Sequence, residues 1–152
     1  MNPYKCVLAF AVTLAAGAAA AEERPVPANP PADVWQQECA ACHLAFPPYM
    51  LPSKSWKQLM QELNRHFDTD ASLSDQETQS ISRYLLKYAG NDKYFDGVPL
   101  RITQTSRFRQ EHDAIEPSVI RREAVKSLAN CKACHPGAER ESFEEAELKI
   151  PD

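Results

Sequence analysis

The sequence predicts a mainly α-helical protein made of two small helical domains. Apolar residues recur at helical spacing through much of the chain, and no segment shows the alternating pattern of a half-buried strand. One short motif, C-x-x-C-H, occurs in each half, at residues 39–43 and 131–135. Residues 91–100 interrupt the helical pattern with glycine and proline. We therefore expect a first domain over residues 33–90, a linker over 91–100 and a second domain over 101–152.

The N-terminal segment, residues 1–21, has the features of a secretory signal peptide. Lys5 precedes an apolar run at residues 7–12, and small residues continue to Ala21. A retained membrane anchor is the alternative, but the apolar run is short and no charge cluster follows it. We expect cleavage after Ala21 and no stable membrane insertion afterwards. Residues 22–32 are rich in proline and predict an extended leader.

Two helices are expected in the first part of the first domain. One covers residues 33–41 and leads into the first motif. The next begins near Ser53 or Ser55 and continues to Phe67. Its large apolar side chains recur at helical spacing, at Trp56, Leu59, Met60, Leu63 and Phe67. This spacing predicts one buried helix face.

A third helix has the clearest end signals in the chain. Residues 74–77, Ser-Asp-Gln-Glu, predict a capping box, and the helix is expected to stop at Gly90. In the second domain, one helix is expected over residues 105–114. Another begins at Pro117 and runs towards Ala129, just before the second motif.

The C-x-x-C-H motif is the signature of covalent c-type haem attachment. The two copies supply the thiols that add to the vinyl groups of two haems: Cys39, Cys42, Cys131 and Cys134. The next residue in each copy, His43 or His135, is then the proximal ligand of the iron. The fifth cysteine, Cys6, leaves with the signal peptide, so no thiol remains for a disulfide. Two covalently attached haem c groups are therefore expected.

Two other interpretations of the cysteines fit less well. Zinc-binding Cys pairs usually lie within about 20 residues of each other, whereas roughly 90 residues separate these two pairs. A thioredoxin-like dithiol needs a βαβ context, and the helical patterns around both motifs do not supply one.

The two motifs do not identify the sixth ligand of each iron. Of the four histidines, His66 lies 23 residues after His43, and His112 lies 23 residues before His135. Each half thus contains one spare histidine, and we predict that His66 and His112 bind the irons as distal ligands. Two methionines are the alternatives at the first haem, Met50 and Met60. Ligation by two histidines favours a low-potential carrier, because a thioether ligand raises the haem potential.

Size and charge narrow the functional classes. The chain has 152 residues with 17 basic and 21 acidic side chains, for a net charge of −4. Loss of Lys5 with the signal peptide makes this −5, and haem propionates add further negative charge. We therefore expect no nucleic-acid binding. A mature chain of about 131 residues has a modest core, which haem must supplement.

Several segments resemble the bacterial dihaem cytochrome c family. In the first half they are Ser55-Trp56-Lys57-Gln58-Leu59-Met60 to His66-Phe67, Ala71-Ser72-Leu73 and Ile81-Ser82-Arg83-Tyr84-Leu85. In the second half they are Leu100-Arg101-Ile102-Thr103, His112, Asn130-Cys131-Lys132-Ala133-Cys134-His135, and Phe143-Glu144-Glu145 to Ile150-Pro151. One departure is Arg107-Phe108, where we would expect an aromatic pair. The resemblance covers nearly all of the mature chain.

This resemblance implies a periplasmic protein with a class I-like cytochrome c domain followed by a second haem domain of unusual fold. It implies bis-histidine haems, with His66 and His112 as the distal ligands. It also implies redox proteins as partners, among them a small oxygen-binding cytochrome c and a membrane cytochrome b. We therefore predict an electron-transfer protein without catalytic residues. The alternative is a haem enzyme with peroxidase-like or nitrogen-oxide chemistry, or a ligand-binding sensor, either of which needs a labile distal ligand.

Overall fold

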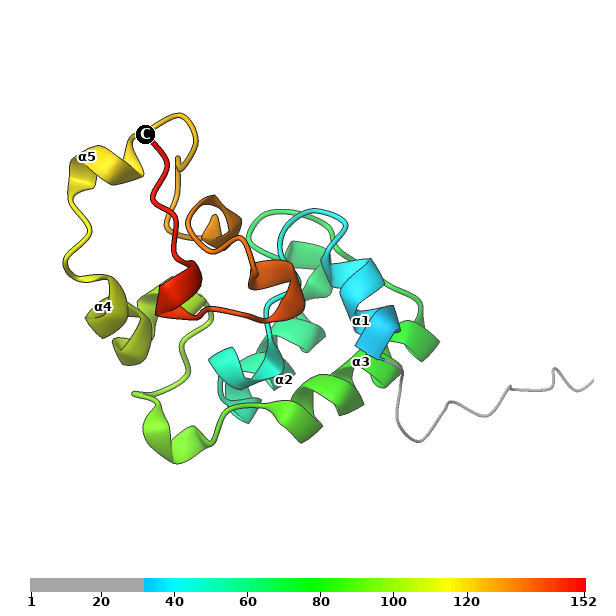
Figure 1. The fold of residues 1–152 in the computed structure, drawn as a ribbon. Coiled ribbons are helices and arrows are strands. Elements are labelled where there is room, and N and C mark those ends of the chain that lie inside the picture. The colour runs from blue at the N-terminus through cyan, green and yellow to red at the C-terminus, as the bar shows by residue number, and fades with distance from the viewer. Residues whose placement is uncertain (1–31) are drawn as a thin grey trace, which may run out of the picture.

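The structure, a computed structural model, describes residues 32–152, which form helices and turns (Figure 1). The α-helices are α1 (Ala32–Cys39), α2 (Ser53–Gln61), α3 (Asp75–Tyr88), α4 (Ser106–His112) and α5 (Pro117–Ile120). Short 3-10 helices of three residues lie between and after them, and the described residues contain two isolated bridges but no strand. The predicted mainly α class is confirmed. The predicted signal peptide, and the leader except for Ala32, lie outside the described residues.

The apolar core lies in the first half, where α3 packs against both α1 and α2. Ile81 and Leu85 of α3 are almost fully buried. The rest of the cluster comes from α1, α2 and the chain between them: Trp35, Ala45, Leu51, Trp56 and Leu59. The indole N–H of Trp56 donates to the carbonyl of Pro48 at 2.6 Å, so its polar atom is satisfied inside the core. This packing fixes α1, which ends at the first cysteine of the first motif.

Helix α3 begins with the predicted capping box. The backbone N–H of Glu77 donates to Ser74 Oγ at 3.3 Å, and the Glu77 carboxylate accepts the Ser74 N–H at 3.0 Å. The helix ends at Tyr88, and Gly90 follows its end without a left-handed backbone. A Cβ at Gly90 would lie 2.5 Å from the carbonyl oxygen of Tyr49 and 2.6 Å from the Phe95 ring. Glycine is needed at position 90 because Tyr49 and Phe95 lie too close for a side chain, and not because the residue caps the helix.

Helix α2 is shorter than predicted, because it ends at Gln61 instead of continuing to Phe67. A 3-10 helix, Leu63–Arg65, follows, and His66 stands at its end. In a continuing α-helix the carbonyl of Leu63 would accept the N–H of Phe67. It accepts the N–H of His66 at 3.3 Å and that of Ala71 at 2.9 Å instead. This contact across a turn overrides the helical spacing, and Phe67 and Asp68 adopt positive φ there.

In the second half, α4 agrees with the predicted helix, and Thr105 caps it by accepting the Phe108 N–H. Helix α5 begins at Pro117 as predicted but ends at Ile120, well before Ala129. From residue 121 to residue 129 only Val125 is buried, so no apolar face supports a longer helix.

The two halves are packed against each other through a few contacts. Leu100 and Ile102 rest on the core of the first half, and the side chain of Gln36 in α1 donates to the carbonyl of Glu139 at 3.4 Å. The division at residues 91–100 remains a prediction. The C-terminal segment returns past the second motif, where the N–H of Lys149 donates to the carbonyl of Cys134 at 2.9 Å (Figure 1).

Candidate haem-binding site

The first motif lies on the turn that follows α1. The core holds α1 through Trp35, and the chain leaves the helix at Cys39, so that Cys42 and His43 are exposed beyond its end. His43 Nδ1 donates to the carbonyl of Leu44 at 2.7 Å. This bond fixes the orientation of the ring.

His66 faces His43 across a short gap. The ring centroids are 6.1 Å apart and the ring planes differ by 23°. The end of α2 and the following 3-10 helix bring His66 to this position, so the early end of α2 is what places the side chain.

The second motif begins with a 3-10 helix, Cys131–Ala133, and the N–H of His135 donates to the carbonyl of Cys131 at 2.8 Å. His112, the last residue of α4, lies opposite His135 with ring centroids 6.2 Å apart and ring planes at 63°. The structure therefore brings the four sequence-predicted histidines together as two pairs, one in each half.

The spacing within both pairs is that expected for two imidazoles on one metal ion. Metal–imidazole bonds are about 2 Å long, so two rings bound from opposite sides have centroids about 6 Å apart. Pairing within each half also means that neither spare histidine reaches across to the other motif.

Hydrogen bonding and burial at these histidines suit metal binding. His43 and His112 each use Nδ1 as a donor, to the carbonyls of Leu44 and Phe108, so that Nε2 is the ring atom left to face a metal. Burial, followed by the charges of His43 and Arg101, lowers the pKa of His66. Burial, followed by the charge of His112, lowers the pKa of His135. A lowered pKa favours the neutral imidazole, which is the form that binds a metal.

Besides Ser55 Oγ, two buried side-chain atoms have no hydrogen-bond partner in the described part of the protein, His66 Nδ1 and His135 Nδ1. Each belongs to one of the two pairs, and the other member of that pair is anchored to a backbone carbonyl. Each pair thus combines one histidine held by a hydrogen bond with one held by packing.

Each of the four histidines packs against one phenylalanine, a feature that the sequence did not lead us to expect. Phe46 lies 5.1 Å from His43, and Phe67 lies 4.8 Å from His66. In the second half, Phe108 stacks on His112 at 4.0 Å, and Phe143 lies 5.5 Å from His135. Every one of these phenylalanines stands within eight residues of its histidine, and that proximity was the available signal. Phe108 by itself supplies the ring where an aromatic pair was expected.

The motif cysteines are compatible with covalent attachment. All four are free of disulfides. Burial, with a smaller contribution from Glu38, raises the pKa of Cys39 to about 11, and burial also raises the pKa of Cys131. A buried thiolate is unfavourable, whereas a thioether carries no charge, so thioether formation suits these surroundings.

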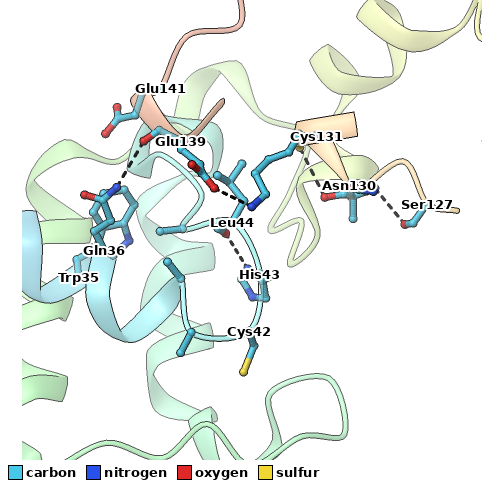
Figure 2. A pocket seen from close by; sticks show the side chains of 15 residues that line it. Trp35, Gln36, Cys42, His43, Leu44, Ser127, Asn130, Cys131, Glu139 and Glu141 are labelled. Atoms are coloured by element: carbon cyan, nitrogen blue, oxygen red, sulfur yellow. Dashed lines mark hydrogen bonds and ion pairs between the residues drawn. The ribbon is translucent and has the colours of Figure 1, made fainter. Parts of the chain in front are cut away.

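Both motifs border one cavity of about 480 Å³ (Figure 2). Cys42 and His43 line it from the first half, and Asn130 and Cys131 line it from the second. Lys132 also lines it and donates to Glu139 at 2.7 Å. The two motifs therefore face a shared space.

The structure gives no support to a zinc site on the two cysteine pairs, or to Met50 or Met60 as a ligand of the first haem. Among residues 32–152 no group of three or more His, Cys, Asp or Glu side chains gathers around a common point, as a zinc site formed by the two Cys pairs would require. Met60 packs against the apolar core, in keeping with the predicted stripe. Met50 lies in the 3-10 helix Pro48–Met50.

The sequence model of a family described as dihaem cytochrome c matches residues 35–143. No curated protein gives a significant match.

Solved structures give three informative matches. A crystal structure of DHC purified from Rhodobacter sphaeroides is 40% identical, with a TM-score of 0.65, covering 73% of this chain and 96% of that one. A diheme cytochrome c from the same organism is 38% identical, with a TM-score of 0.66 and coverages of 73% and 95%. A diheme cytochrome type c from Shewanella baltica OS155 is 33% identical, with a TM-score of 0.70 and coverages of 78% and 91%.

Proposed function

Because the chain belongs to the dihaem cytochrome c family and so carries two covalently attached haem c groups, we propose that it is an electron carrier with two bis-histidine irons. His43 and His66 hold one iron, and His112 and His135 hold the other. Cys39, Cys42, Cys131 and Cys134 form the thioether bonds. The observation that carries this proposal is the spacing of about 6 Å within both histidine pairs.

Bound haem supplies a one-electron Fe(III)/Fe(II) couple. The four histidines would hold the two irons in either redox state, so little would have to rearrange when an electron arrives. Their hydrogen bonds to Leu44 and Phe108 and their phenylalanine neighbours restrict ring rotation. An iron held by two histidines would offer no open position for substrate chemistry, which favours a carrier over an enzyme. Both motifs border one cavity, so two haems attached there would lie near each other, as exchange of an electron between them requires.

For cellular location and partners we propose the periplasm and other redox proteins. The predicted signal peptide supports export, and residues 32–152 contain no helix long and apolar enough to cross a membrane. A small oxygen-binding cytochrome c and a membrane cytochrome b are the proposed partners, as the resemblance to the dihaem cytochrome c family implies. A negative net charge argues against nucleic acid as a partner.

The ligand assignment is tested by His66→Ala and His112→Ala. Each substitution should convert one of the two haems from low spin to high spin and leave the other unchanged, as followed by absorption and electron paramagnetic resonance spectra of the holoprotein. Met50→Leu and Met60→Leu are the matched controls and should leave both haems low spin. An unchanged spectrum in either histidine variant would remove that residue from the proposed ligand set.

A further inference from the structure

The two histidine pairs differ in the charge that lies beside them. The guanidinium carbon of Arg101 lies 4.0 Å from the centroid of the Phe67 ring, and Phe67 lies 4.8 Å from the His66 ring. A cation over an aromatic face is held there by the ring's quadrupole. Arg101 is thus fixed one ring away from a proposed iron ligand.

The surroundings of His66 also include a cavity of about 240 Å³. His66, Phe67 and Arg101 line it, together with the charged residues Glu62, Arg65 and Asp68. Of these side chains, only Arg101 is held against a ring that contacts His66. Its positive charge contributes to the lowered pKa of that histidine, after burial and the charge of His43.

The second pair has no counterpart of Arg101 among the described contacts. The rings that pack on His112 and His135 are those of Phe108 and Phe143. Among residues 32–152, no Lys or Arg side chain lies over either of these two rings. Near that motif, Lys132 is paired with Glu139 at 2.7 Å. Its charge is therefore largely compensated.

A fixed positive charge favours the reduced state of a nearby iron, because reduction adds one negative charge. We propose that Arg101 raises the reduction potential of the iron held by His43 and His66 and so biases a single electron towards the first haem. This proposal rests on the proposed function. Arg101 shifts an internal equilibrium in which one electron leaves the iron of the second pair and reduces the iron of the first, with no change in bonds or protons.

The size of the effect is limited by solvent. Arg101 is exposed, so water and salt screen its charge. We expect its removal to lower the equilibrium constant for reduction of the first haem by several-fold and at most about tenfold, which is about 59 mV for a one-electron couple. The shift should shrink as ionic strength rises.

The test is a redox titration of the holoprotein in which both one-electron steps are resolved. Arg101→Gln removes the charge, Arg101→Lys keeps it, and Arg121→Gln removes an equal charge from the end of α5, in the other half. His66→Met identifies the step that belongs to the first haem, because a thioether ligand raises its potential strongly. Absorption spectra should show that both haems stay low spin in the three arginine variants.

The proposal predicts that Arg101→Gln lowers the step identified by His66→Met and leaves the other step in place, while Arg101→Lys and Arg121→Gln move neither step appreciably. The proposal is overturned if Arg101→Gln changes neither reduction potential or changes both equally. It is also overturned if Arg101→Lys lowers the potential of the first haem as much as Arg101→Gln does. Failure of the proposed function looks different: if His66 is not a ligand, His66→Met leaves both potentials unchanged.

Discussion

His43 and His66 show what the number and position of histidines can predict and what they cannot. Four histidines divided evenly between two halves, two of them within motifs, were enough to predict two ligand pairs. Their phenylalanine neighbours and Arg101 were not predictable in the same way. Stacking at 4.0 Å between Phe108 and His112 depends on the turn of α4, and the contact of Arg101 with the Phe67 ring joins residues 34 positions apart in the chain. Such contacts are set by tertiary packing rather than by local pattern.

Gly90 provides a test of packing at a single residue. Gly90→Ala places a Cβ 2.5 Å from a backbone carbonyl, that of Tyr49, which cannot move away without disturbing the chain. We expect it to lower the free energy of unfolding by about 3 kcal/mol, the upper part of the range for overpacking. Denaturant unfolding of the holoprotein measures this change.

Gly97→Ala is the control for that experiment. Gly97 has φ +72° but open space around its Cα, so alanine there meets strain without a clash. Its expected cost is about 1 kcal/mol. Equal costs at the two positions would contradict the close-approach explanation of Gly90.

At the scale of elements, residues that signal a helix start predicted the helix boundaries better than the spacing of apolar residues did. The capping box fixed the start of α3, and Pro117 the start of α5, because each signal is chemically local. Periodicity carried the predicted α2 too far, to Phe67, and the helix predicted from Pro117 towards Ala129 was also too long. It could not reveal that the carbonyl of Leu63 bonds to Ala71, or that the residues after Ile120 bury only one apolar side chain.

The capping box of α3 makes a prediction that depends on pH. Hydrogen bonds from the side chain and then the backbone of Ser74 hold the pKa of Glu77 below its usual value. A carboxylate with a depressed folded-state pKa stabilises the fold above its unfolded pKa and loses that effect as pH falls through the folded one. Ser74→Ala should therefore cost about 1 kcal/mol at neutral pH and progressively less in acid.

Unfolding curves of the wild type and of Ser74→Ala across acidic and neutral pH measure that difference. Glu77→Gln is the control, because it keeps a hydrogen-bonding side chain but has no titrating group. In a Glu77→Gln background the cost of Ser74→Ala should not vary with pH. A cost that stays constant with pH when Glu77 is present would mean that the carboxylate takes no part in the cap.

At the scale of the whole molecule, the first half has most of the apolar core and the second half depends more on turns. The largest buried cluster comes from α1, α2, α3 and the chain between α1 and α2, whereas Val125 and Ala138 are the buried apolar residues described after residue 100. Covalent haem adds apolar surface to a half that buries little of its own. Both haems are therefore expected to support the fold as well as the function.

The central claim is that both irons are closed by histidine on each side. It is tested most directly by the absorption spectrum of the dithionite-reduced protein with and without carbon monoxide. The account predicts a low-spin c-type spectrum that the gas leaves unchanged. A shifted Soret band would show that at least one iron opens, which contradicts the carrier assignment and favours a haem enzyme or a ligand-binding sensor.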